Sequence, residues 1–313
     1  MIPFILRRVA AGVVIVATLC VLAFFLLYLG AQDTARNIVG QTASDEIVAR
    51  KAAELGIDRP LAVQFGEWVS RAVTGDLGRS WFTGEPVAET LLARVPVTLS
   101  ITIGAIVLSG ILAIVLGALA AGRRGWTDRS VQVASVVAAA VPGFLFALAL
   151  ATVFGLVLRW FPATGYIPLA TSVSGWLSTI TLPVIALAIG ATAAVAQQVR
   201  GSMIDVLRMD YIRTLRSRGL PVTRVVYVHA LRNAAGPALG VLGLQFVVVF
   251  GGAVIVEQVF SLPGLGQAAV AATSRGDVPV VMGVVIVTAI LVVIVNLAID
   301  LLQGWLNPKV RLT

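Results

Sequence analysis

The sequence predicts an all-α, polytopic membrane protein with six transmembrane helices and a small external helical subdomain after the first of them. Two observations carry this prediction, namely the composition and the length of the apolar runs. Of the 313 residues, 58% are hydrophobic and only 12% are charged, and the mean hydropathy is +0.98. A soluble domain carries about 25% charged residues. The apolar runs must be helical, because backbone polar groups in lipid need partners within their own segment.

Six apolar segments are long enough to cross a membrane. At ~1.5 Å per residue, a helix of about 20 residues crosses a hydrocarbon core of ~30 Å. The first segment follows Arg7 and Arg8 and is longer than the apolar core of a signal peptide, so we expect a first span there. The third contains Pro142-Gly143, which permits a kink, and the fourth has Pro183 near its start. The six segments are residues 9–30, 97–121, 131–158, 179–199, 238–256 and 280–306.

Arginine is concentrated in the loops on one side of the predicted membrane domain. The loop between the fourth and fifth spans alone carries seven arginines, whereas the opposite short loops carry one each, Arg159 and Arg275. Basic loops stay in the cytoplasm, so both termini are predicted to be cytoplasmic. The net charge of +8 follows from this topology, and no aromatic-basic groove indicates a nucleic-acid partner.

Residues 31–96 are mixed in charge and predict a small folded subdomain outside the membrane. Residues 44–55 predict a short helix that Gly56 and Pro60 close. Apolar residues from Leu61 then recur with helical spacing until residues 75–78, Gly-Asp-Leu-Gly, break the pattern. The chain thus divides into residues 1–30 (a cytoplasmic stub and the first span), 31–96 (the external subdomain) and 97–313 (spans two to six, with a cytoplasmic hairpin at 203–233).

Residue types that enzymes and metal sites require are scarce. The single cysteine, Cys20, excludes an intrachain disulfide, and the single histidine, His229, excludes a multi-histidine metal site. No catalytic Ser or Cys constellation and no cluster of cytosolic carboxylates indicates an enzyme. The only lysines are Lys51 and Lys309, and no Gly-x-x-x-x-Gly-Lys-Ser/Thr loop is present to hold ATP phosphates. We therefore expect no cofactor in this chain.

The hairpin at 203–233 is the most informative segment, because it is basic and amphipathic between two apolar runs. Apolar residues at spacings of three and four predict one face of a single helix, from which Arg208, Arg213 and Arg216 point away. That face consists of Ile204, Leu207, Tyr211 and Leu215. Asp205 and Asp210 each precede an arginine by three residues, which favours a surface helix.

A turn and a second short helix are predicted to complete the hairpin. Gly219 stands where the first helix ends and the backbone needs a positive φ, and Pro221 suits the first turn of the second helix. This helix is predicted to run to about Asn233, with Pro237 leading into the fifth span. Such a hairpin fits a docking element for a soluble protein. The alternative is that its arginines only bind lipid phosphate and fix the topology.

Several short pieces in a fixed order resemble those of a known family, namely the B-type permease subunits of the dipeptide, oligopeptide and nickel ABC importers. Residues 210–219 followed by 229–233 resemble the coupling loop of these permeases. The match covers nearly the whole chain, with departures at Leu215 (usually Ala), Pro221 (usually a Ser-type cap) and Asn307 (usually acidic). The other matching pieces are residues 75–80, 94–99, 126–129, 141–144, 200–203, 251–254 with Glu257, 260–266, Asn296 with Asp300, and 307–311.

The resemblance implies a type I ABC importer permease fold in a bacterial inner membrane. It implies a second homologous permease subunit as heterodimer partner, two cytoplasmic ATPase domains that hold ATP and Mg, and an extracytoplasmic substrate-binding protein. The coupling loop is expected to sit in a cleft of the ATPase and to transmit its movement. The residues expected to couple are Asp210, Tyr211, Ile212, Arg213, Thr214, Leu215, Arg216, Ser217, Arg218, Gly219, His229, Arg232 and Asn233.

Four residues are candidates for the translocation path or its gate. Asn296 and Asp300 lie one turn apart in the sixth span, where an intramembrane carboxylate indicates function, although a helix-packing bond, to Arg311 or to a partner loop, is the alternative. Glu257, at the outer end of the fifth span, either shapes an outer gate, docks the binding protein, or caps the following loop. Pro142 allows a kink for packing or gating.

The cargo and the class of transporter have alternatives at this stage. A peptide is the expected cargo, with a nickel chelate or a haem-like compound as alternatives within the same family. A stand-alone secondary transporter or channel is the rival from another class. Such a carrier normally buries several carboxylates or broken helices at mid-membrane, and the Val-, Leu- and Ala-rich spans favour the ABC permease.

Overall fold

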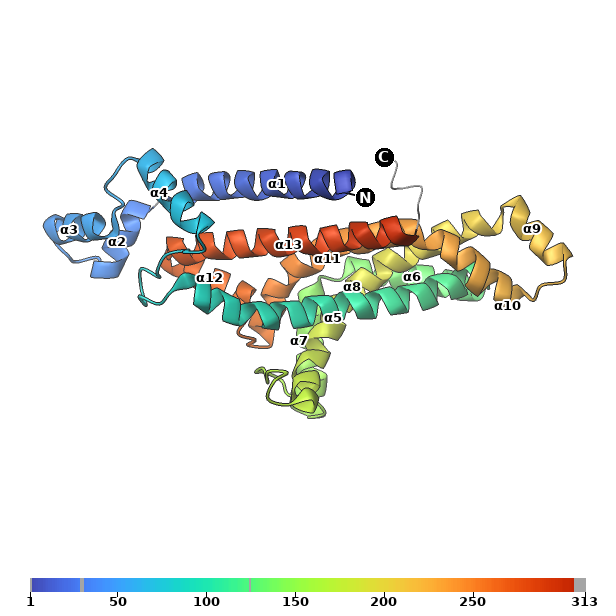
Figure 1. Ribbon diagram of the computed structural model, residues 1–313. Helices are drawn as coiled ribbons and strands as arrows, with labels where there is room; N and C mark the ends of the chain where they lie inside the picture. The colour runs from blue at the N-terminus through green and yellow to red at the C-terminus, as the bar shows by residue number, and fades with distance from the viewer. Residues whose placement is uncertain (1, 29–30, 124, 307–313) are drawn as a thin grey trace. The chain divides into compact units, whose positions relative to one another are not determined.

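A computed structural model describes residues 2–28, 31–123 and 125–306, and within these ranges the chain forms helices and turns without a β-strand (Figure 1). The predicted all-α class is confirmed. The helices in chain order are α1 (Ile2–Tyr28), α2 (Ala31–Val39), α3 (Asp45–Leu55), α4 (Leu61–Val73), α5 (Val87–Gly122), α6 (Trp126–Ala140), α7 (Gly143–Leu150), the π-helix η1 (Ala151–Val157), α8 (Val173–Leu207), α9 (Asp210–Ser217), α10 (Val222–Arg224), the π-helix η2 (Val225–Ala230), α11 (Leu231–Val259), α12 (Leu265–Arg275) and α13 (Val278–Leu306).

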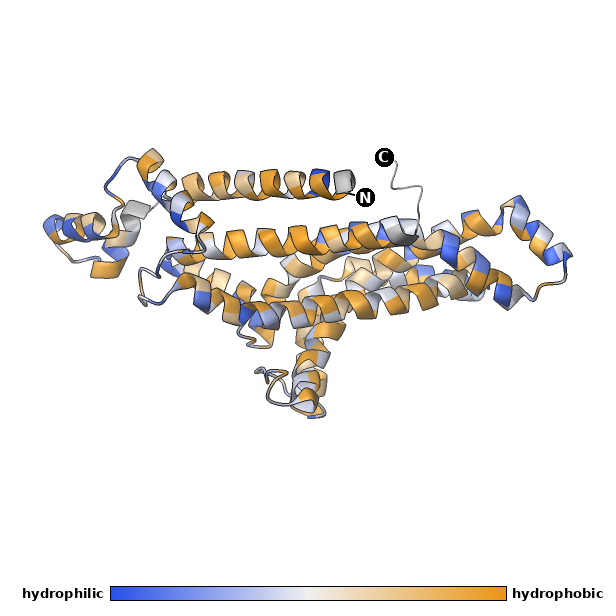
Figure 2. Cartoon of the chain, in the orientation of Figure 1, coloured by the Kyte–Doolittle hydropathy of each residue, from blue (hydrophilic) through white to orange (hydrophobic). Residues whose placement is uncertain are grey.

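Membrane-length helices match the predicted spans. Among the described residues, five helical segments are long and apolar enough to cross a membrane, and the pair formed by α6 and α7–η1 makes a sixth if it is counted as one broken span. Figure 2 shows hydrophobic residues along α1, α5 and α13, whereas hydrophilic residues interrupt α9. The five segments are Ile5–Tyr28, Val87–Gly122, Val173–Leu207, Val225–Val259 and Val278–Gly304. The chain is therefore a multi-pass membrane protein, as its sequence predicts.

The chain divides into two compact units. Among the described residues, the first unit comprises 97–262 and 295–306, and the second comprises 2–96 and 263–294. The helices α5 and α13 each contribute to both units. The segment boundaries expected at residues 30 and 96 stay predictions.

The first unit is built around α8, which packs against α6, α7 and α11. Its approach to α5 is close at Gly117, where an added Cβ would lie 2.8 Å from the carbonyl oxygen of Ala196 and 2.7 Å from Cβ of Val199. Small residues at such crossings let membrane helices approach until their backbones are in contact. This crossing fixes α8 against α5 close to the hairpin.

The third predicted span is broken at Val141 and Pro142. Val141 is extended, with φ −87° and ψ 124°, and the axes of α6 and α7–η1 differ by 93°. Proline forces the preceding residue out of the helical region and cannot donate the backbone hydrogen bond that would continue a helix. The sequence predicted a permissive kink here, and the structure shows a complete interruption.

The second unit has an aromatic core. Phe24 of α1 is fully buried, and its ring centroid lies 3.9 Å from that of Tyr28, 5.1 Å from that of Phe65 and 6.0 Å from that of Trp68. The two short helices predicted in this part of the chain are confirmed as α3 and α4. The left-handed Gly56 ends α3, with φ 71°.

A buried carboxylate fixes the loop between α4 and α5. Asp277, which is 5% exposed, accepts hydrogen bonds from Ser80 Oγ at 2.5 Å and from the Trp81 backbone N–H at 3.1 Å. The predicted break at residues 75–78 is confirmed by positive φ angles at Gly75 and Gly78. This loop is therefore an ordered part of the second unit.

Candidate functional site

The basic hairpin lies at one end of the first unit, where α9 and α10 follow the end of α8 (Figure 1). The prediction that one helical face runs from Ile204 to Leu215 is wrong. The helix α8 ends at Leu207, Met209 is extended with φ −68° and ψ 149°, and α9 begins at Asp210. The break changes which side chain faces inward, because Ile212 rather than Tyr211 becomes the buried residue of α9.

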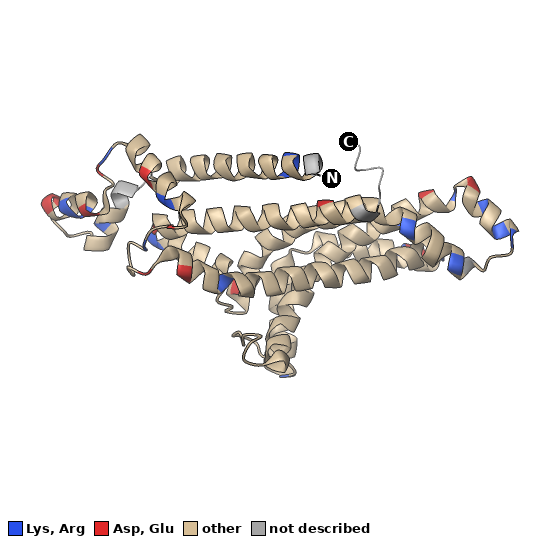
Figure 3. Cartoon of the chain, in the orientation of Figure 1, with Lys and Arg blue, Asp and Glu red and all other residues tan. Residues whose placement is uncertain are grey.

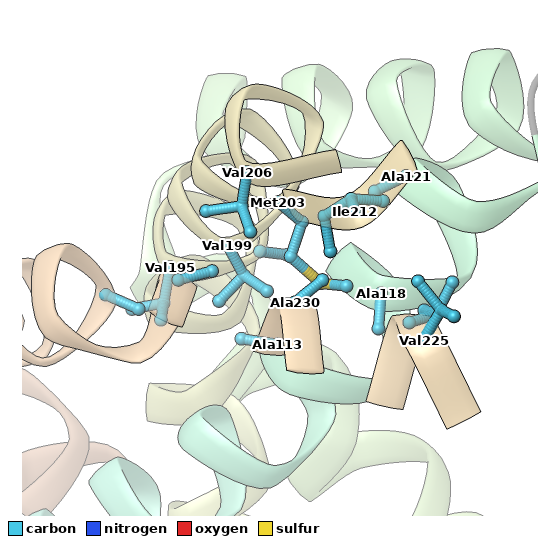
Figure 4. Close-up of a cluster of buried hydrophobic side chains, with 14 residues drawn as sticks. Ala113, Ala118, Ala121, Val195, Val199, Met203, Val206, Ile212, Val225 and Ala230 are labelled. Atoms are coloured by element: carbon cyan, nitrogen blue, oxygen red, sulfur yellow. The ribbon is translucent and has the colours of Figure 1, made fainter. Parts of the chain in front are cut away.

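Ile212 anchors α9 in the core of the first unit (Figure 4). Its side chain is fully buried in a cluster with Met203 and Val206 of α8 and with Val225 of η2. Burying an isoleucine of this kind stabilises a fold by about 1.5–3 kcal/mol. The other members of the cluster are Ala113, Ala118 and Ala121 of α5, Val195, Ala196 and Val199 of α8, Val226 and Ala230 of η2, and Ala234 and Ala238 of α11. The hairpin is therefore packed onto three of the long helices.

Gly219 forms the predicted turn. Its φ is +78°, and the N–H of Gly219 donates to the Arg216 carbonyl at 3.0 Å while the N–H of Leu220 donates to the Leu215 carbonyl at 3.3 Å. These two bonds form a Schellman motif, which ends a helix through a left-handed residue. An added Cβ at Gly219 would meet no atom within 4 Å, so the backbone conformation alone demands glycine.

The second arm of the hairpin has no break between it and the fifth span. The prediction that it ends near Asn233 is wrong, because α10, η2 and α11 follow one another without interruption and Pro237 lies inside α11. A proline removes one backbone donor from a helix, and the flanking residues keep their helical conformation here. The hairpin therefore connects directly to α8 on one side and to α11 on the other.

A polar contact ties the two arms together. Asn233 Nδ2 donates to the Tyr211 hydroxyl at 2.9 Å and to the His229 carbonyl at 3.0 Å. Three of the predicted coupling residues are thus brought into one contact. Arg232 lies beside them on α11 and is exposed.

The outer surface of α9 is basic and exposed (Figure 3). Arg213, Arg216 and Arg218 are all exposed, and the side chain of Arg213 lies 3.5 Å from Asp210 with 78% of its surface accessible. An exposed ion pair at that distance contributes little to stability. Thr214 and Ser217, also exposed, bond only to carbonyls of their own helix, those of Asp210 and Thr214. This surface offers guanidinium groups for charge-assisted contacts to acidic groups of another protein.

Sequence reasoning missed an ion pair beside the hairpin. Arg200 of α8 donates to both carboxylate oxygens of Asp128 in α6, through Nε to Oδ1 and through Nη2 to Oδ2, the latter at 2.8 Å. The side chains are 22% and 18% exposed. Both residues lie in matching pieces that the sequence had singled out, but 72 positions separate them along the chain, so only the folded structure pairs them.

The four candidates for the translocation path do not form one site. They lie on α11, on α13 and at the break between α6 and α7. Glu257 of α11 is fully buried and accepts a hydrogen bond from Thr98 Oγ1 at 2.6 Å, so this conformation does not present it to a soluble partner. Asn296 and Asp300 lie one turn apart on α13 and are half-buried, and Pro142 is exposed at the break between α6 and α7. Arg311, the alternative partner for Asp300, and Asn307 lie outside the described residues.

A mostly apolar cavity of about 650 Å³ lies in the first unit between α5, α6 and α8. Its lining includes Leu112 of α5, Ala134 of α6 and Thr192 of α8, and Thr192 is 8% exposed. Groups of three or more His, Cys, Asp or Glu side chains that could hold a metal ion do not occur in the part of the chain that the structure describes.

Comparisons with known proteins give one consistent result. Residues 113–312 match the family described as a binding-protein-dependent transport system inner membrane component, and residues 1–102 match the family described as the N-terminal part of such a membrane component. A Brucella abortus protein that carries the name of a peptide transport system permease is 38% identical, over 99% of both chains. An Escherichia coli K12 protein named for D,D-dipeptide transport is 37% identical over 98% of this chain and 97% of its own, and a glutathione transport system permease of E. coli O6:H1 is 34% identical over 99% of both.

Proposed function

The chain belongs to the binding-protein-dependent transport system inner membrane components, which makes it a permease subunit of an ABC importer, and we propose that its cargo is peptide and that ATPase subunits drive it through the basic hairpin. The hairpin carries this proposal. It combines an exposed basic surface with an apolar anchor, Ile212, in the core of α5, α8 and α11. A segment that only neutralised lipid phosphate would need the arginines but not the anchor.

The division of labour between subunits follows from what the chain carries. ATP and Mg would be bound by two cytoplasmic ATPase domains, since the sequence of this permease subunit has no phosphate-binding loop. A second homologous permease subunit would complete the path as a heterodimer, and an extracytoplasmic binding protein would deliver the cargo. With the hairpin facing the ATPases, both termini lie in the cytoplasm, in agreement with the arginine distribution.

Movement of the hairpin reaches the membrane along two helices. When the ATPases close on ATP, α9 is displaced, and α8 and α11 follow because the hairpin is continuous with both. Ile212 and the contact between Tyr211 and Asn233 keep the two arms together during this movement. Rigid rocking of packed helices is an ordinary route to alternating access.

Peptide is the cargo that the relatives favour. Their names refer to peptide, D,D-dipeptide and glutathione transport, and these compounds share an amide backbone. The described spans carry few ionisable side chains, so selectivity would reside in the binding protein rather than in the path. Among the residues that the structure describes, no group of His, Cys, Asp or Glu side chains suits a metal ion, which gives no support to a nickel cargo.

Reconstituted transport tests this proposal. The chain would be purified with its second permease subunit and its ATPases and reconstituted into liposomes. The binding protein would be added together with a panel of labelled di- and oligopeptides or with nickel salts. We expect uptake of a peptide that requires ATP and stimulates its hydrolysis. Nickel uptake without peptide uptake would contradict the cargo, and uptake by the chain without any ATPase subunit would establish a stand-alone carrier.

A further inference from the structure

The ion pair between Asp128 and Arg200 joins α6 to the helix that bears the hairpin. Both N–H groups on one edge of the guanidinium face both carboxylate oxygens, and each side chain is about four-fifths buried. A bidentate pair of this kind fixes orientation as well as distance. It therefore constrains α6 more tightly than an apolar contact of the same size.

The helix α6 packs against α8, but most of its residues are exposed. Ser135 is its only buried residue among the fifteen of the helix, and Val133, Val136 and Val137 are all more than half exposed. The cavity of about 650 Å³ lies along the side of α6 that faces α5 and α8. The packing of α6 against α8 therefore covers only one side of α6, and the ion pair adds a directional contact between the two helices.

Arg200 lies on the rigid base of the hairpin. It is flanked along α8 by Val199 and Met203, which belong to the same core as Ile212 of α9. The helix continues without interruption to Leu207. Any displacement of α9 that moves this end of α8 therefore moves Arg200 with it.

The other end of α6 is the break at Val141 and Pro142. Beyond it, α7–η1 runs at 93° to α6. A break of this kind can act as a hinge. Displacement of the first turn of α6 by Arg200 then changes the angle between α6 and α7–η1. The pair stands at the hairpin end of α6 and the hinge stands at its far end.

We propose that Asp128 and Arg200 are positioning residues that carry the movement of the hairpin into α6, and through the break at Val141 and Pro142 into α7–η1. The inference rests on the proposed function, because it requires an ATPase that moves the hairpin. Without the pair, α8 and α11 still receive the movement, whereas α6 keeps only its packing contact with α8 and follows it less closely. ATP hydrolysis then continues with less transport for each ATP consumed.

Charge-altering variants of the assembled transporter test this role. Arg200→Gln and Asp128→Asn each remove the ion pair, and the double variant Asp128→Arg with Arg200→Asp restores it with the charges exchanged. Arg200→Lys keeps the positive charge but cannot form the bidentate contact. The matched control is Arg59→Gln, which removes a bidentate pair with Glu67, at 2.6 and 2.9 Å, in the second unit. The readouts are retention of the ATPase subunits, the rate of ATP hydrolysis, and the peptide taken up per ATP.

We expect each single variant to lower the uptake per ATP about fivefold or more while the ATPase subunits stay bound. The reversed pair should recover most of the loss, Arg200→Lys should give an intermediate value, and Arg59→Gln should match the unaltered chain. Wild-type uptake per ATP in Arg200→Gln or Arg200→Lys overturns the inference, as does a reversed pair that assembles but stays uncoupled. If a single variant does not assemble, the reversed pair and Arg200→Lys decide the question.

Failure of this inference and failure of the proposed function give different results. If the unaltered chain does not retain the ATPase subunits, the proposed function fails. If it retains them and transports peptide, but loss of the ion pair leaves coupling unchanged, only the role of Asp128 and Arg200 fails.

Discussion

At the scale of single residues, the left-handed Gly219 and the buried Ile212 set the geometry of the hairpin. Gly219 could be predicted from the sequence, because a glycine at the end of an amphipathic helix is a local signal for a left-handed cap. The burial of Ile212 was not predictable, since it depends on the extended conformation of Met209, which redirects the chain. The partnership of Asp128 with Arg200 depends on the packing of α6 against α8.

Gly219→Val tests the turn at this scale. Valine in the left-handed region costs roughly 1–3 kcal/mol, and no neighbouring atom contributes to the effect, because the space around Gly219 is open. We expect the variant to hydrolyse ATP while its peptide uptake per ATP falls, because the two arms of the hairpin no longer hold their angle. Transport assays on the reconstituted complex measure both quantities.

Gly75→Val is the matched control for that variant. Gly75 also has a positive φ, of 88°, and an added Cβ there would meet no atom within 4 Å, but it lies in the loop after α4. The two variants should lose similar amounts of stability, and only Gly219→Val should lose coupling. If both variants take up as much peptide per ATP as the unaltered chain, the turn at Gly219 has no role in coupling ATP hydrolysis to transport.

At the scale of elements, hydropathy located the helices and said little about how they pack. The short helices α3 and α4 and the apolar spans were predictable because each has its own periodicity and end signals. The interruption between α6 and α7 was underestimated, because a proline inside an apolar run permits either a kink or a break. The continuity of η2 with α11 does not follow from the sequence, because a proline such as Pro237 more often marks a helix boundary than a position inside a helix.

The crossing of α5 and α8 gives a prediction at this scale. Alanine at Gly117 would bring Cβ within 2.8 Å of a backbone carbonyl oxygen of α8, whereas alanine at Gly110 would lie 3.7 Å from the flexible side chain of Leu242. Replacing glycine by alanine in a helix stabilises it by about 1 kcal/mol, and overpacking costs about 1–3 kcal/mol.

We therefore expect Gly117→Ala to lower the melting temperature of the purified protein and Gly110→Ala to leave it unchanged or raise it. Thermal unfolding in detergent, followed by loss of the monodisperse peak in size-exclusion chromatography, compares the two variants under the same conditions. A Gly117→Ala protein as stable as Gly110→Ala would show that α5 and α8 separate easily, and that the close crossing does not brace the hairpin.

At the scale of the whole molecule, composition established a polytopic membrane protein and arginine distribution predicted its orientation. Neither could establish what drives the protein, because the exposed arginines of α9 suit lipid phosphate as well as an acidic protein surface. The structure adds the apolar anchor of α9 and the direct connection of the hairpin at 203–233 to α8 and α11. These features favour a hairpin that receives force from a partner.

Site-specific photo-crosslinking in the working transporter tests that claim most directly. A benzoylphenylalanine replaces Arg216 on the exposed side of α9 in one variant and Arg71, exposed on α4, in another. We predict a covalent adduct between the Arg216 position and an ATPase subunit, formed in complexes that still transport peptide, and no such adduct from the Arg71 position. A transporting complex in which the hairpin position never crosslinks to the ATPase would contradict it.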